Sequence, residues 1–124
     1  MKLKLLVAAA ILLPSAASAQ SMNAEQFLKR ATALKKKGAM AIFSGGEIKS
    51  IMSEGQAASK FAREGRQADL KAGRQPRFCP EGGVKLNSDE FMLRLAAIPL
   101  AERARINMGE ATIRILAAKA PCPR

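Results

Sequence analysis

The stretch Arg77-Phe78-Cys79-Pro80-Glu81-Gly82-Gly83-Val84 decides the fold, because it holds one of the chain's two cysteines. The other cysteine, Cys122, is preceded by Pro121 and followed by another proline. Proline fixes φ and disfavours helix at the residue before it, so both cysteines should lie at the ends of segments. Two glycines after Pro80 allow a tight turn. We therefore expect a disulfide between the two cysteines that closes the C-terminal half of the domain.

Two other roles for these cysteines fit the sequence less well. A zinc site needs more ligands than two cysteines, and the chain has no histidine. The wide separation of Cys79 and Cys122 also excludes a C-x-x-C redox motif. A structural disulfide across this separation would stabilise the domain by about 4 kcal/mol in the chain-entropy model.

The N-terminus has the pattern of a secretory signal peptide over residues 1–19. Met1–Lys4 carries two lysines, and Leu5–Leu13 is an apolar run of nine residues, too short to span a bilayer. Pro14 ends this run, and Ala17-Ser18-Ala19 is a small-residue cleavage site. We expect a mature chain, residues 20–124, that is exported to a bacterial periplasm, where oxidising conditions permit a disulfide.

The composition of the remaining chain favours one helical domain with a strong positive charge. Apolar residues make up 48%, with five phenylalanines and no tyrosine or tryptophan, and abundant alanine favours helix over sheet. Loss of Lys2 and Lys4 with the signal would lower the net charge from +11 to +9. Such a protein should prefer anionic partners. Nucleic acid is not expected in an envelope, and no later segment is apolar enough to cross a membrane.

The first helix is marked by a capping box of Asn23 and Gln26. Its apolar residues fall on one face at helical spacing: Phe27, Leu28, Ala31 and Leu34. Lys35, Lys36 and Lys37 crowd its last turn, and Gly38 should end it. The lysines act either as a favourable C-terminal charge on a solvated face or as a binding patch, and we favour the first interpretation.

Residues 39–52 predict a second helix in which Ile48, Ile51 and Met52 share a face. Gly45-Gly46 should kink this helix or allow another backbone to approach closely, at about 1 kcal/mol per glycine. Ser44 beside these glycines is not expected to be a catalytic nucleophile, because there is no G-x-S-x-G motif and no histidine to act as a base.

The segment from Lys60 to Arg77 has six cations and two carboxylates, a net charge of +4. Gly65 and Gly73 interrupt it, and we interpret it as a frayed helix that runs into an exposed loop. Arginine is suited to planar carboxylate contacts, so this segment is the best candidate for an interaction surface. A solvated loop with no partner is an equally good interpretation. The candidate partner-binding residues are Arg63, Arg66, Lys71, Arg74 and Arg77.

Two further helical patterns follow the Cys79 turn. Asn87 and Glu90 predict a second capping box, before an apolar stripe that ends near Pro99. The last helix is expected from about Leu100, with a second start at Asn107, and it should stop at Pro121. The whole is an all-α, compact single domain of about four helices with one disulfide.

In the cysteine, proline and helix positions described above, the chain resembles the Rap/Tai family. Members of that family are small periplasmic helical proteins, and several are immunity proteins against type VI secretion amidase effectors. The resemblance rests on Phe78-Cys79-Pro80, Gly83-Val84, Pro99, Leu116 and Pro121-Cys122. Phe27–Ala31 is similar to the family's F-L-x-x-C, and Ser44–Ile51 to its C-x-G-Y-V-x-G-V. Ala31 and Ser44 stand in place of the two cysteines, so both partners of one family disulfide are replaced together. The structural disulfide role transfers to Cys79 and Cys122, and no partner contact transfers.

The resemblance implies a binding protein: an immunity-like inhibitor of an envelope-targeted effector, of the peptidoglycan amidase type. If the basic segment 60–77 contacts this effector, charge complementarity requires an acidic face on the effector. The alternative is a general basic periplasmic protein, chaperone-like or bound to anionic surfaces, with no toxin partner. An enzyme is not expected, because catalysis would depend on carboxylates and lysines that form no evident paired site. No catalytic, cofactor-binding or metal-binding residue is predicted. A homodimer remains open.

Overall fold

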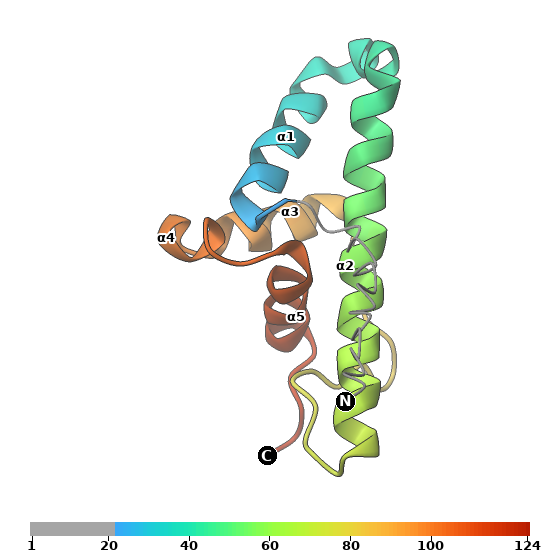
Figure 1. The fold of residues 1–124 in the computed structure, drawn as a ribbon, viewed down its shortest axis with the longest axis vertical. Helices are drawn as coiled ribbons and strands as arrows, with labels where there is room; N and C mark the ends of the chain where they lie inside the picture. The colour runs from blue at the N-terminus through green and yellow to red at the C-terminus, as the bar shows by residue number, and fades with distance from the viewer. Residues whose placement is uncertain (1–21) are drawn as a thin grey trace, which may run out of the picture.

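A computed structural model describes residues 22–124, and in this part of the chain the fold is all-α, as predicted (Figure 1). The predicted signal peptide, residues 1–19, lies outside the described residues. The elements are α1 (Ala24–Lys37), the 3₁₀ helix η1 (Gly38–Ser44), α2 (Gly45–Lys71), α3 (Ser88–Ala97), the single turn α4 (Leu100–Arg103) and α5 (Met108–Lys119). α1 and α2 form a hairpin joined by η1, and α5 lies beside the lower half of α2 in Figure 1.

The start of α1 is fixed by its own cap and by two distant elements. The Asn23–Gln26 capping box is confirmed, with both reciprocal bonds present. The Met22 N–H donates to the carboxylate of Glu54, which is buried in the middle of α2, at 2.6 Å. The Ala24 N–H donates to the carbonyl of Ile106, just before α5, at 2.9 Å. The first helix is thereby held against α2 and against the chain just before α5.

The helix α2 is longer than the sequence predicts. It is continuous for 27 residues, so the expected end near residue 52 is wrong. After Lys60 the expected helix and the exposed loop that follows it are both present, but the helix is regular to Lys71 rather than frayed. The glycines at 55 and 65 lie inside it and cost about 1 kcal/mol each. Ala58 and Ala62 are fully buried, and these small side chains let α2 lie close to α5. Tertiary packing of this kind outweighs a modest propensity cost.

The C-terminal helices begin at the predicted caps but are divided differently. Asn87 and Asn107 each accept a hydrogen bond from the backbone N–H three residues later, at 2.8 Å. The predicted second capping box is only half formed, because the Glu90 carboxylate accepts from Lys119 and Arg94 instead of bonding back to Asn87. A separate turn, α4, precedes the helix that starts after Asn107, so the last helix does not begin at Leu100.

Two groups of buried side chains form the core. The larger joins α1, α2, α3 and α5 and consists of Met22, Ala24, Phe27, Ala58, Leu95, Met108, Ala111 and Ile115. The smaller consists of Ala62, Phe78 and Ile113, with Leu116 and Ala117 packed against it. The predicted disulfide is confirmed next to the smaller group: Cys79 and Cys122 have Cα atoms 4.8 Å apart, and the Cys79 N–H donates to the Ala120 carbonyl at 2.8 Å.

Candidate functional site: an apolar groove beside the basic face of α2

A groove open to solvent lies between α1, α2 and α3, with α5 at its floor and the chain after Cys79 along one side. Its volume is about 1300 Å³, which exceeds the usual range of roughly 300–1,000 Å³ for small-molecule pockets. Most of its lining is apolar and comes from all these elements, including Phe27, Met52, Val84, Phe91 and Leu116. A groove of this size and openness suits a segment of another protein better than a small metabolite.

The decisive stretch of sequence builds one wall of this groove. Phe78 is 5% exposed and packs in the smaller core group, which fixes the chain where it meets α5. Beyond Pro80 the chain makes a turn in which the Gly83 N–H donates to the Pro80 carbonyl at 2.9 Å. Gly82 and Gly83 have φ of 89° and 86°, a backbone conformation that favours glycine. The turn brings Val84 to the groove.

The floor of the groove carries a buried polar group. Thr112, on α5, is 5% exposed, and its hydroxyl oxygen has no hydrogen-bond partner among residues 22–124. Buried polar groups are nearly always hydrogen-bonded, and an unsatisfied one calls for an explanation. The Thr112 hydroxyl oxygen lies beneath the surface of the groove and is not exposed to an occupant.

On the α2 side the groove is deepened by a glycine, Gly55, which has no side chain. Met52, Gly55 and Ser59 line it at helical spacing, so the glycine leaves a notch between two larger residues. A Cβ atom added at Gly55 would meet no atom within 4 Å. The notch is therefore empty space, and a larger side chain at residue 55 would fill it without displacing the protein's own atoms at that Cβ.

The five predicted partner-binding residues fall into two groups. Arg66, Arg74 and Arg77 are held by ion pairs with Glu81, Asp69 and Glu110 at 2.7–3.0 Å. The side chains of Arg63 and Lys71 form no hydrogen bond or ion pair within the described chain, and only Arg63 of the five lines the groove. The structure thus leaves Arg63 as the basic residue best placed to meet an anionic group of a segment bound in the groove.

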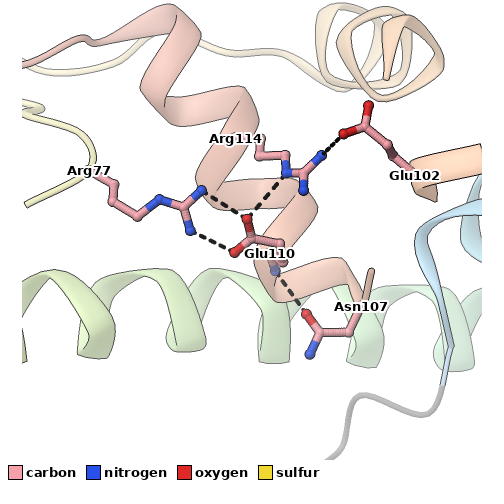
Figure 2. Close-up of polar contacts among 5 residues, drawn as sticks. All are labelled: Arg77, Glu102, Asn107, Glu110 and Arg114. Carbon is pink, nitrogen blue, oxygen red and sulfur yellow. Dashed lines mark hydrogen bonds and ion pairs between the residues drawn. The ribbon is translucent and has the colours of Figure 1, made fainter. Parts of the chain in front are cut away.

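Arg77 shows that a basic residue of the segment 60–77 can be bound within the protein rather than available to a partner (Figure 2). Its guanidinium donates two hydrogen bonds to the Glu110 carboxylate, at 2.7 and 2.8 Å. Glu110 also accepts from Arg114 at 3.2 Å, while Arg114 donates to Glu102 at 3.1 Å. The Glu110 N–H is itself capped by Asn107. The network joins the loop before Cys79 to the first turn of α5.

These contacts shift the pKa values of the network in the direction that keeps its charges. The Arg77 hydrogen bonds hold the pKa of Glu110 below its ordinary value, and Arg114 adds to the effect, against the opposing influence of burial. The same pair raises the pKa of Arg77. Both shifts favour the charged forms that the ion pair needs.

Sequence reasoning did not find the groove. Its walls come from four helices and a loop whose relative positions no local pattern specifies, and α2 was expected to stop before Gly55. One usable signal was the small residues Gly55, Ala58 and Ala62 at helical spacing, which indicate a helix face shaped for close contact.

Comparisons of this chain with protein-family models, curated proteins and solved structures give no match. The part of the chain that the structure describes contains no group of three or more cysteine, aspartate or glutamate side chains placed to hold a metal ion. None of the helices between residues 22 and 124 has the length and apolar character needed to span a bilayer.

Proposed function

We propose that this protein is a small exported inhibitor that binds an envelope-targeted effector of the peptidoglycan amidase type, as its resemblance to the Rap/Tai family implies. The observation that supports this most directly is the open apolar groove, with Arg63 among its lining residues. A disulfide-closed helical domain is compatible with an oxidising periplasm, the compartment to which the signal-like N-terminus would deliver it.

In this proposal a protruding segment of the effector lies in the groove. Apolar side chains of the segment would replace water against Phe27, Phe91 and Leu116, which is the main source of affinity. A carboxylate of the effector would pair with Arg63. Groove and rim together would supply an interface of ordinary size, roughly 800 Å² per partner.

Co-expression with a candidate secreted amidase tests the proposal. We expect the protein to restore survival of cells that carry the amidase in their periplasm, and to form a 1:1 complex that withstands raised salt. Gly55→Phe should abolish both effects, because its ring fills the notch in the groove. Gly65→Phe is the matched control: it makes the same change in the same helix, also in open space, but away from the groove.

Two results would contradict the proposal. The first is undiminished toxicity with no complex for every amidase tested. The second is equal loss of protection by Gly55→Phe and Gly65→Phe with helicity unchanged, which would place the interface outside the groove.

A further inference from the structure

The turn between α1 and α2 is apolar and exposed, unlike any other turn in the described chain. We call this turn, Gly38–Ser44, the tip; it lies at the opposite end of the long axis from the C-terminus (Figure 1). Met40, Ile42 and Phe43 are 63, 74 and 78% exposed. None of the three belongs to either core group or lines the groove. Three neighbouring apolar side chains left in water require an explanation.

Cations surround the tip. From Lys29 to Lys49 the sequence carries six basic residues and one carboxylate, Glu47. Arg30 neutralises that carboxylate through two hydrogen bonds of 2.6 Å. Lys36 and Lys49 form no hydrogen bond or ion pair among residues 22–124. The other lysines have partners: Lys29 pairs with Glu25, Lys35 with Asp89, and Lys37 donates to Ser44. An exposed apolar cluster with such a collar of lysines is the arrangement that binds anionic bilayers, where apolar side chains enter the interface and lysines meet the headgroups.

We propose that the tip is a docking surface for an anionic phospholipid bilayer, with the helical hairpin standing end-on. Two features favour lipid over protein. Lysine is depleted in protein–protein interfaces, and a seven-residue tip is small beside the roughly 800 Å² per partner of a stable complex. A second copy of this chain is disfavoured too, because a symmetric contact would bring the two lysine collars together.

The chain contains no tryptophan, so a single introduced tryptophan reports on one position. In Phe43→Trp we expect a blue-shifted emission and protection from an aqueous quencher with vesicles of phosphatidylglycerol and phosphatidylethanolamine. No change is expected with phosphatidylcholine alone, and raised salt should reverse the shift. Leu93→Trp is the control, because Leu93 is 73% exposed but lies on α3.

Substitutions in the otherwise unaltered protein separate the apolar and the charged contributions. Lys36→Gln/Lys49→Gln should weaken vesicle binding about tenfold or more at low salt, since each lysine near the surface contributes about 1 kcal/mol. Lys71→Gln/Lys85→Gln makes the same charge change away from the tip and should weaken binding much less. Ile42→Ser/Phe43→Ser should also lose binding, whereas Leu93→Ser/Leu100→Ser should retain it.

The proposal would be overturned if both tryptophan probes responded alike, or if the two lysine pairs had equal effects, which would indicate a diffuse attraction of the whole molecule. A blue shift of Phe43→Trp that grew with protein concentration in the absence of lipid would assign the tip to self-association. Because Gly55→Phe leaves the tip intact, vesicle binding by that variant separates this proposal from inhibition through the groove.

Discussion

The segments that flank α2 at its two ends are stabilised in opposite ways. At the closed end, residues 72–87, the chain has no regular structure, yet Phe78 is buried and the adjacent disulfide ties it to the tail of α5. Arg77 adds a bidentate ion pair to the same helix. At the tip, the chain is helical throughout, but its largest side chains point into solvent and no cross-link constrains it.

The comparison shows that regular secondary structure and stability are different properties in this domain. An irregular segment can be rigid when long-range bonds fix it, and a helical one can be mobile when few buried contacts hold it. Met40, Ile42 and Phe43 belong to neither core group, so packing of the core does not account for these apolar residues of the tip. The following predictions address this contrast.

Removal of the disulfide should have the largest effect. Cys79→Ala/Cys122→Ala opens a loop with a sequence separation of 43 residues and should cost about 4 kcal/mol of unfolding free energy. Urea denaturation measures this loss. Hydrogen exchange should show faster opening of residues 72–87 and the end of α5, with the tip unchanged. Equal stability of the variant and the parent would show that the disulfide does not stabilise this end of the molecule.

The two phenylalanines at opposite ends form a matched pair. Phe78→Ala should cost about 3 kcal/mol, since it leaves a cavity in a small core group. Phe43→Ala should change stability by no more than about 0.5 kcal/mol, because that ring is already in water. Thermal denaturation of the two variants side by side is sufficient. A large loss for Phe43→Ala would mean that the tip is packed in solution.

Glycine substitutions should change stability in opposite directions along the hairpin. Gly38, which ends α1, has φ of 53° and ψ of −125°, so Gly38→Ala should destabilise by about 1–2 kcal/mol. Gly55→Ala lies within α2 in open space and should stabilise by about 0.5–1 kcal/mol. Denaturant titration distinguishes the signs. Stabilisation by both would contradict the backbone described at the entrance to the tip.

Acidification should produce the smallest and most gradual effect. Three glutamates have a lowered pKa because their carboxylates accept hydrogen bonds from cations. Arg30 donates to Glu47, and Arg77 is the main donor to Glu110. Glu90 accepts chiefly from Lys119 and then from Arg94. A carboxylate whose pKa is lower in the folded state stabilises the fold at any pH above the ordinary glutamate pKa of 4.5. This stabilisation is lost as the pH falls through the pKa of the folded state.

Unfolding free energy should therefore decline on acidification below about pH 5. Carboxyl NMR titration should give all three glutamates pKa values below the ordinary one. Glu110→Gln should flatten part of the pH profile and loosen the closed end, whereas Glu47→Gln should act near the tip. A profile unchanged in either variant would show that its ion pair does not persist in solution.

Local signals in the sequence predicted the local features of this fold. The caps at Asn23, Asn87 and Asn107 each depend on a side chain and an N–H three residues away, so they are visible in a short window. The disulfide was predictable because two cysteines allow only one intramolecular pair. These features fix where helices start and how the closed end is tied, and they define the fold class.

Features set by distant partners were not predictable in the same way. The glycines of α2 read as breaks because the burial of Ala58 and Ala62 against α5 is invisible to a local pattern. The basic segment looked like one surface, but the structure pairs Arg66, Arg74 and Arg77 with carboxylates at sequence separations of 15, 5 and 33. Only a three-dimensional arrangement separates Arg63 and Lys71 from that group.

The notch at Gly55 has an evolutionary consequence. Because the helix tolerates a side chain there and the space beyond is empty, a change of a single codon can make the groove shallower without a penalty in folding. A series from glycine through alanine and valine to leucine would grade its capacity to receive bulky anchors. Lineages that diverge at this one position would acquire different binding preferences on an unchanged scaffold.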